Sequence, residues 1–309
     1  MPEYAIGVDL GGTNLKAAAI SSSGEMLERT NATTDLTQGP ERVVDDIVDC
    51  IESLRGRFAG SRLAGAGIGV PGFIRMAEGF IVGSHNLPPL NNYPIRDAIE
   101  KRLGTKVFLE NDANAAALGE KWMGAGRDVD DLVLLTLGTG IGGGVISRGR
   151  VMHGFVGMAA ELGHITVVPN GNPCGCGNRG CVEKHASATA IESMANLLAL
   201  GQNLTAKDVY DLAAAGDERA RAIFRTMGQC LGIAVANLIN IFNYPLYLMS
   251  GGVLAAWDYF YPALLEEVQW RSFTFRNTGT RIEKALLGSE AGLYGAAYLP
   301  MQAPTVAAH

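Results

Sequence analysis

The chain has 309 residues and carries 25 basic side chains against 31 acidic ones, so its formal net charge is −6. Hydrophobic residues make up 48% and charged residues 18% of it, which excludes an intrinsically disordered chain and a coiled coil. The length predicts two domains. The acidic balance argues against a nucleic-acid-binding surface, because such a surface needs basic side chains to displace counterions.

Strand-like and helix-like patterns alternate along the first part of the chain. Apolar residues stand on both sides of a Gly-Gly-Thr turn within residues 4–20, which predicts a β-hairpin. Apolar residues spaced by three and four predict an amphipathic helix over residues 41–58. We further expect a buried strand over 63–70, a helix over 95–103, a strand over 106–109 and an alanine-rich helix from 112 to 122.

The second part of the chain begins with the same kind of hairpin. A strand over 132–137, the turn Gly138-Thr139-Gly140 and a strand over 143–147 repeat the design of residues 5–20 about 127 positions later, which indicates two similar halves. Helices over 187–200, 205–212 and 217–241, a strand over 246–249 and a final helix over 292–299 follow. This alternation of strands and helices predicts an α/β architecture.

The first hairpin turn has the composition of an anion-binding turn. Gly11 and Gly12 lack Cβ atoms, so backbone N–H groups and the Thr13 hydroxyl can approach a phosphate, and Asp9 just before them can hold hydrated magnesium. No Walker A motif is present, and a strand rather than a helix follows. An ordinary tight hairpin would explain this turn alone. The second turn of the same type, at residues 138–140, favours two hairpins that grip one polyphosphate.

A possible general base stands where a strand ends and a helix begins, which is where open α/β sheets place their ligands. Asn111 and Asp112 occupy this position. Asp112 could also be a simple N-cap of the helix. The two interpretations are compatible, because a helix N-terminus favours an ionised carboxylate that can accept a proton.

Three cysteines and a histidine predict a metal site. Thiolates and imidazole are ligands of tetrahedral zinc, and the glycines between the cysteines allow a tight fold. A disulfide is a poorer explanation, because closely spaced cysteines pair with difficulty and one thiol is left over; inert buried thiols remain possible. Four protein ligands leave no open position, so the zinc should be structural. Cys50 and Cys230 lie in helical patterns and are expected in the core. The predicted ligands are His164, Cys174, Cys176 and Cys181.

Two carboxylates flank the predicted zinc loop. Glu161 lies three residues before His164, and Glu183 lies two residues after Cys181. Each alone would usually be a solvated surface group. On one rigid loop they suit a polyhydroxylated ligand, whose hydroxyl groups can donate to carboxylates and accept from neighbouring donors.

Targeting signals are not evident in the sequence. The N-terminus has neither the basic nor the apolar region of a secretory signal. The longest apolar stretch, residues 231–242, is interrupted by Asn237 and Asn240 and is shorter than the ~20 residues of a membrane span. Five cysteines with a metal-type spacing fit a reducing compartment. We therefore expect a soluble, cytoplasmic protein without a membrane partner.

Taken together, these motifs resemble the ROK sugar kinases, a family named for repressors, open reading frames and kinases. The resemblance covers nearly the whole chain and follows the family's order: residues 9–16, 69–72, 110–112, 137–144, 161–164, 174–183 and 250–253. It implies an actin-like (ribonuclease H-like), duplicated fold of two α/β domains with a central cleft, and a homodimer. The implied domains are residues 1–118 together with a C-terminal helix at 290–302, and residues 119–289 with the zinc loop.

The resemblance also implies the chemistry. An ATP-dependent enzyme of this kind transfers the γ-phosphoryl group to the 6-hydroxyl of a hexose, with Mg²⁺, and glucose is the first choice ahead of N-acetylmannosamine, N-acetylglucosamine or fructose. Asp112 would be the base. The implied sugar ligands are Asn86, Asn111, Asp112, Glu161, His164 and Glu183, with His164 also on zinc. The implied nucleotide ligands are Asp9, Gly11, Gly12, Thr13, Lys16, Gly138, Thr139, Gly140, Gly251 and Gly252.

Two features bear on the alternatives. Many relatives carry Pro-Asn-Leu followed closely by Trp, whereas residues 85–90 read His-Asn-Leu-Pro-Pro-Leu, so the exact hexose is open. A sugar-responsive repressor of the same family would carry a helix-turn-helix, but three residues precede Tyr4. A sugar-binding protein without kinase activity is disfavoured by the intact Asp112. Polyphosphate is a less expected donor than ATP, because no basic track for a long polyanion is evident.

Overall fold

The computed structural model describes residues 3–76, 78–84 and 86–302, which form two compact units. The first unit contains the described residues up to Asp130, together with Gly144–Ala159 and the chain from Leu286 onward. The second contains Asp131–Gly143 and Ala160–Ala285. The chain first leaves the first unit near residue 130. The domain limits at residues 118 and 290 stay a prediction, since compact units need not coincide with folding domains.

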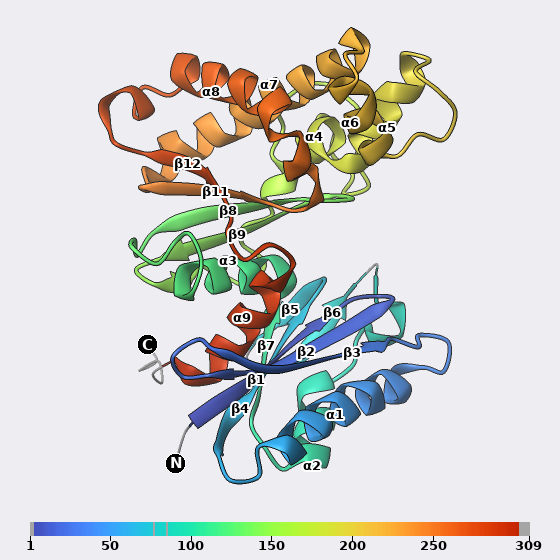
Figure 1. Cartoon of the computed structure of the whole chain (residues 1–309), viewed down its shortest axis with the longest axis vertical. Helices are drawn as coiled ribbons and strands as arrows, with labels where there is room; N and C mark the ends of the chain where they lie inside the picture. The colour runs from blue at the N-terminus through green and yellow to red at the C-terminus, as the bar shows by residue number, and fades with distance from the viewer. Residues whose placement is uncertain (1–2, 77, 85, 303–309) are drawn as a thin grey trace. The chain divides into compact units, whose positions relative to one another are not determined.

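The first unit is built on a five-stranded sheet (Figure 1). The predicted hairpin is present, because β1 and β2 pair in antiparallel fashion, while β1 pairs with β4, and β4 with β7, in parallel. The strand order is β3 (Met26–Thr33), β2 (Asn14–Ser21), β1 (Glu3–Leu10), β4 (Arg62–Val70) and β7 (Val107–Asn111). A separate two-stranded sheet joins β5 (Phe73–Arg75) to β6 (Phe80–Gly83).

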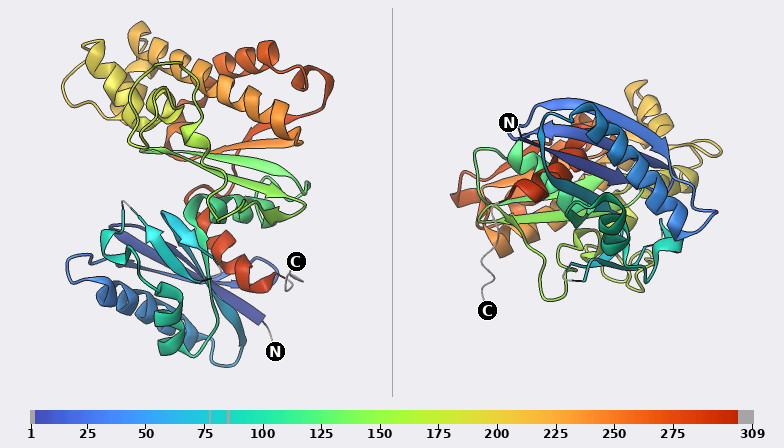
Figure 2. Two further views of the ribbon diagram at one scale, coloured as in Figure 1. Left: turned by 180° about the vertical axis from the view of Figure 1, so that it is seen from behind. Right: turned by 90° about the horizontal axis from the view of Figure 1, so that it is seen from below.

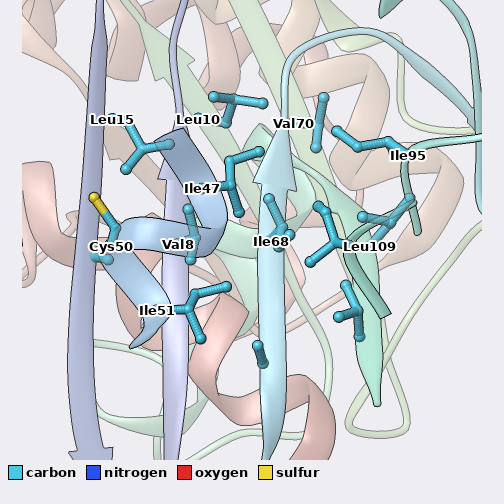
Figure 3. Packing of buried hydrophobic residues seen from close by; sticks show 14 of the residues in the cluster. Val8, Leu10, Leu15, Ile47, Cys50, Ile51, Ile68, Val70, Ile95 and Leu109 are labelled. Atoms are coloured by element: carbon cyan, nitrogen blue, oxygen red, sulfur yellow. The ribbon is translucent and has the colours of Figure 1, made fainter. Parts of the chain in front are cut away.

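Helices cover both faces of this sheet (Figure 1). Figure 3 shows one core layer, in which Val8 of β1 and Ile68 of β4 pack with Ile47 and Ile51 of α1 (Pro40–Arg57). Alternate strand residues face the other way, because side chains alternate across a strand. There Ala5 and Ala18 pack with Leu293 of α9 (Ala291–Tyr298). Helices α2 (Ile95–Leu103) and α3 (Asp112–Trp122) complete the unit.

Close approach between β1, β4 and α9 requires glycine. A Cβ atom on Gly7 would overlap the Leu293 carbonyl, and one on Gly67 would overlap the Ala296 carbonyl. The glycines therefore let the helix backbone rest directly on the sheet. The final predicted helix, residues 292–299, corresponds to α9 and belongs to this first unit.

The second five-stranded sheet repeats the arrangement of the first. Its strand order is β10 (Arg150–Val151), β9 (Ile141–Ser147), β8 (Leu132–Leu137), β11 (Leu246–Ser250) and β12 (Arg281–Lys284). As in the first sheet, an antiparallel ribbon is followed by parallel strands, since β11 pairs in parallel with both β8 and β12. The predicted α/β class and the duplication are thereby confirmed.

The helices of the second unit gather on one side of β11 and β12 (Figures 1 and 2). Ser187, the first residue of the predicted helix 187–200, is the N-cap of α5, because its hydroxyl accepts from the Ala190 N–H. The helices are α4 (Glu183–Ala186), α5 (Ala188–Leu197), α6 (Ala206–Ala214), α7 (Glu218–Phe242) and α8 (Trp257–Arg271). Short 3₁₀ turns lie at Pro88–Leu90, Leu162–His164, Gly252–Ala256, Phe275–Asn277, Gly288–Glu290 and Leu299–Met301.

Helix α7 has the predicted length, and it is apolar along most of that length rather than only over residues 231–242. By length and composition alone it could cross a membrane, but 67% of its most apolar 18-residue stretch is buried inside the protein. Gly228 and Gly232 let it pack closely on α8, where added Cβ atoms would meet the Phe260 and Leu264 carbonyls. This burial is typical of a core helix.

Candidate functional site

The first hairpin turn is held by bonds to its carbonyl groups. Thr34 donates from its hydroxyl to the Gly11 carbonyl, 3.0 Å away, and from its N–H to the Thr13 carbonyl, also at 3.0 Å. Neither Gly11 nor Gly12 has a positive φ, so backbone conformation does not require glycine here. The glycines are needed for close approach instead, because a Cβ on Gly12 would lie 2.7 Å from the Asn86 carbonyl oxygen. Because Gly12 has no side chain, the backbone of the exposed Asn86 can lie directly against the turn.

Asp9 lies at the end of β1, opposite Lys16 of β2. Burial raises the pKa of Asp9, and the Lys16 ammonium lowers it in opposition. The Cβ position of Gly292, at the start of α9, is 3.6 Å from the Asp9 carboxyl carbon, so glycine there leaves room around the carboxylate. A bound cation favours the ionised form of a half-buried carboxylate whose pKa is raised by burial. This environment therefore fits a magnesium ligand.

Asn111 and Asp112 sit together at the start of α3, but their local roles differ from the simplest prediction. Asn111, not Asp112, is the N-cap: its Oδ1 accepts from the N–H groups of Ala113, at 3.0 Å, and Asn114, at 3.2 Å. Its Nδ2 donates to the Gly72 carbonyl at 3.3 Å, which leaves one amide hydrogen for a ligand. Asp112 is the first helical residue and is not needed as a cap.

The Asp112 carboxylate combines solvent access with raised basicity. Its side chain is exposed, yet desolvation by the surrounding protein raises its pKa, the Ala113 N–H lowers it and the Asp9 charge raises it further. The exposed surface means that a ligand can reach the carboxylate. A carboxylate with an upward-shifted pKa is a stronger proton acceptor at neutral pH than an ordinary one.

The second hairpin turn, in the other unit, is anchored in the same manner as the first. The Ala188 N–H donates to the Gly138 carbonyl, and the Thr189 hydroxyl donates to the Thr139 carbonyl, both at 2.8 Å. In each hairpin an amide and a threonine hydroxyl therefore hold two turn carbonyls. A Cβ on Gly138 would meet nothing within 4 Å, so this turn is open to a ligand.

The second hairpin opens onto a cavity of about 340 Å³. Gly138, Thr139 and Gly252 line it, whereas Gly140 and Gly251 support the surrounding turns. Gly251 has φ +100° and no room for a Cβ beside the Leu137 carbonyl. The volume lies in the range of small-molecule sites. Val253, from the predicted motif at residues 250–253, also lines the cavity. Further lining residues, which the sequence did not indicate, include Ile191, Lys207, Tyr210, Phe224 and Ala256.

Glu183 connects the cysteine loop to the second hairpin. Its Oε2 accepts from the Ile141 N–H at 3.1 Å, and a Cβ on Gly140 would collide with that oxygen at 2.5 Å. Its Oε1 lies 3.8 Å from the Lys184 ammonium. The predicted sugar ligand is therefore also a structural bridge to the turn, a role that its position in the sequence does not reveal.

The four predicted metal ligands converge. Their ligand atoms all lie within 4.8 Å of one another. The Cys176 and Cys181 sulfurs are 3.7 Å apart, and the Cys174 sulfur is 3.6 Å from His164 Nδ1. Tetrahedral zinc with ordinary bond lengths separates two sulfurs by about 3.8 Å and a sulfur from a nitrogen by about 3.6 Å. The residues thus fit a zinc ion, whereas Cys50 and Cys230 are buried core residues as expected.

His164 presents its two ring nitrogens to different neighbours. Nδ1 faces the cysteine cluster, and Nε2 lies 3.9 Å from the Glu161 carboxylate. Glu161 is itself exposed. An imidazole whose Nδ1 binds a metal would carry its proton on Nε2, next to this carboxylate. The predicted sugar ligands of the second unit, Glu161, His164 and Glu183, thus lie on elements tied to one loop.

Comparisons with known proteins agree with this arrangement. A family model described as the ROK family matches residues 5–303. A glucokinase from Thermotoga maritima is 40% identical over 306 residues, covering 94% of this chain and 95% of the relative. The crystal structure of a ROK hexokinase from Thermus thermophilus is 36% identical, with a TM-score of 0.86 and coverage of 95% and 96%. That of a ROK family glucokinase from Streptomyces griseus in complex with glucose and AMPPNP is 33% identical, with a TM-score of 0.74 and coverage of 97% and 100%.

Proposed function

Because the chain belongs to the ROK family, we propose that it is an ATP-dependent glucokinase, which transfers the γ-phosphoryl group of ATP to the 6-hydroxyl of glucose. The observation that carries this proposal is the Asp112 carboxylate, which is accessible and has a raised pKa at the start of α3. Glucose is supported by relatives named glucokinase, and ATP by the solved relative that holds glucose and AMPPNP.

The 6-hydroxyl group loses its proton to Asp112 as its oxygen bonds to the γ-phosphorus, while the bond from that phosphorus to the β,γ-bridging oxygen breaks and ADP leaves. This step needs a carboxylate that can approach the hydroxyl and accept a proton, and both properties are present. Asn111 offers its remaining amide hydrogen to the sugar, while its other polar contacts keep α3 in place. Asn86, held beside the phosphate turn by Gly12, supplies a further contact. Glu161, His164 and Glu183 of the second unit complete the proposed sugar-binding set.

The nucleotide is proposed to use both hairpins and the cavity. The apolar lining by Ile191, Phe224 and Val253 suits the flat face of a base. Gly138 and Thr139 at the cavity edge, and Gly11, Gly12 and Thr13 of the first hairpin, offer N–H and hydroxyl donors to the phosphates. Magnesium, which neutralises charge on the transferred phosphoryl group when bound, would be held by Asp9 through its waters.

The cysteine loop is proposed to hold a structural zinc ion. His164, Cys174, Cys176 and Cys181 would occupy all four positions, so the ion takes no part in the reaction. Its role would be to fix the backbone between Glu161 and Glu183. A homodimer, a cytoplasmic location and the domain limits at residues 118 and 290 also stay predictions.

A screen of ADP release across hexoses tests the proposal, with ATP and polyphosphate as parallel donors. We expect glucose with ATP to give the highest kcat/KM, with one glucose 6-phosphate formed per ADP. A preference for N-acetylmannosamine, N-acetylglucosamine or fructose would keep the kinase but reject glucose. ADP release that does not depend on any hexose would reject the phosphotransferase.

A further inference from the structure

Glu110, directly before the proposed site pair, is a buried carboxylate with three polar partners. Its side chain is only 2% exposed. Oε1 accepts from the Asn111 N–H at 2.9 Å and from Asn114 Nδ2 at 3.1 Å, and Oε2 lies 2.7 Å from His153 Nε2. A buried carboxylate is costly unless its oxygens are satisfied, and here each partner belongs to α3, its start, or residues 144–159. No step of the proposed reaction accounts for this arrangement.

Asn114 provides a second sign that this network is maintained at a cost. Its Oδ1 is buried and has no hydrogen-bond partner among the described residues. The amide cannot simply be reversed, because Glu110 needs a donor and would then face an oxygen. An unsatisfied buried carbonyl costs on the order of 1–3 kcal/mol. The fold accepts this cost while keeping a donor on Glu110.

Within the described chain, His153 is the one partner of Glu110 that does not come from the start of α3. It belongs to residues 144–159, and its side chain is 39% exposed. It lines two cavities, of about 440 and 640 Å³. The charged residues around these cavities, besides Glu110, are Arg148 and Arg150 in one and Arg75 and Glu78 in the other. His153 is therefore the solvent-facing end of a chain of bonds that leads inward to Asn111.

We propose that Glu110 and His153 form a positioning pair for the reaction, in which His153 holds the Glu110 carboxylate and Glu110 fixes the Asn111–Asp112 backbone. This inference rests on the proposed kinase function for its catalytic consequence. Neither residue touches the reacting atoms. The pair acts through geometry, because Glu110 binds the Asn111 N–H while Asn111 caps the first turn of α3. A shift of the cap moves Asp112, the next residue.

The pair should affect turnover more than substrate binding. A base must lie within hydrogen-bond reach of its proton, and misplacement of about 1 Å can cost ~10²-fold in rate. The proposed sugar and nucleotide contacts of the second unit do not depend on Glu110. Asn111 is the proposed sugar contact that adjoins the pair, so loss of the pair is expected to lower kcat by a larger factor than it raises KM for glucose, with KM for ATP nearly unchanged.

The test compares three variants of the full-length protein. His153→Ala removes the donor to Glu110, and His153→Gln restores a neutral one. Glu100→Gln is the matched control, since Glu100 accepts from the Val107 N–H at 2.8 Å, at the opposite end of the same strand β7. Steady-state kinetics and amide hydrogen exchange are measured on each, below the melting temperature of the least stable variant.

We expect His153→Ala to lower kcat at least tenfold with both KM values within threefold, and to speed amide exchange at Asn111, Ala113 and Asn114 at least tenfold. His153→Gln should recover most of both losses, and Glu100→Gln should change neither. Unchanged exchange in His153→Ala, equal effects in the control, or no recovery by glutamine would overturn the pair. If the wild-type protein phosphorylates no hexose, the proposed function fails, and the exchange measurements still decide whether the pair positions α3.

Discussion

A comparison of Gly12→Ala with Gly138→Ala separates a glycine required by the fold from one required by the ligand. At Gly12 the added Cβ would lie 2.7 Å from the Asn86 carbonyl oxygen, about 0.7 Å closer than the 3.4 Å at which ordinary contacts begin. The obstacle is backbone, which cannot rotate away as a side chain can. At Gly138 the same Cβ meets nothing within 4 Å.

The two variants should therefore differ in stability. Overpacking costs about 1–3 kcal/mol, and each kcal/mol lowers Tm by about 2–4 °C in a unit of 150–250 residues. Gly12→Ala is expected to melt roughly 2–12 °C below the wild-type protein. Gly138→Ala should melt within ~1 °C of it, because the new methyl group is accommodated and the glycine does not have a positive φ.

Ligand binding should differ as well. Gly12→Ala displaces Asn86, so both the glucose and ATP dissociation constants should rise. In Gly138→Ala the methyl group projects where phosphates are proposed to bind, so ATP affinity alone should fall about tenfold, or ~1.4 kcal/mol. Differential scanning calorimetry and isothermal titration calorimetry measure the two effects. Unchanged nucleotide affinity in both variants would refute the two-hairpin phosphate site, and an equal loss of Tm would refute the packing argument.

Asp112, His153, Cys176 and Ala160 each give a further testable prediction. On the acid side, kcat/KM for glucose should fall as Asp112 becomes protonated, with a midpoint above its ordinary pKa of 3.8, and a midpoint at or below 3.8 would contradict the raised pKa. The hydrogen bond to Glu110 raises the pKa of His153. The stability that protonated His153 contributes should therefore be complete below pH ~6.5, its unfolded-state pKa, and should disappear as pH rises through its folded-state pKa. Tm measured against pH in the wild-type protein and in His153→Gln checks this, and identical slopes would count against it. Cys176→Ser should lower the zinc content from about one per chain and raise KM for hexose more than for ATP, by elemental analysis and kinetics; full activity in zinc-free wild-type protein would reject the site. Ala160 has φ +68°, a conformation that glycine adopts more easily than alanine. Ala160→Gly should therefore raise the free energy of unfolding by about 0.5 kcal/mol, because the strain relieved in the folded state exceeds the entropy that glycine adds to the unfolded state. Urea unfolding measures this change, and a loss of stability would show that the conformation is not strained.

Strong hydrophobic periodicity made much of the fold predictable. Helix α2 has the predicted limits, and α1, β4 and α7 begin and end within a residue or so of theirs. Helix α8 was not predicted, because Pro262 lies inside it and its apolar residues do not form one clear stripe. Strand β3 was also missed: its burial alternates as expected for an edge strand, but its sequence is polar and carries no run of β-branched residues.

The site was predictable where chemistry follows from local spacing and not where it depends on distant partners. The Cys174, Cys176 and Cys181 spacing placed three ligands within eight residues, and His164 joins them in the structure. By contrast, nothing near Thr34 in the sequence indicates that it holds the first hairpin turn at Gly11, 23 residues earlier, and His153 lies 43 residues from Glu110. Such contacts arise from the sheet topology, which brings together segments that the sequence separates.

Asp112, as the base for phosphoryl transfer to glucose, is the central residue of the proposed mechanism. The decisive measurement is kcat for glucose phosphorylation in Asp112→Asn, together with the glucose dissociation constant by calorimetry. The amide keeps the shape of the side chain but cannot accept the hydroxyl proton, so kcat should fall by ~10² to 10⁴ while the dissociation constant stays within about threefold. A variant that binds glucose and turns over within about threefold of wild type, under ~1 kcal/mol of barrier, would contradict the account.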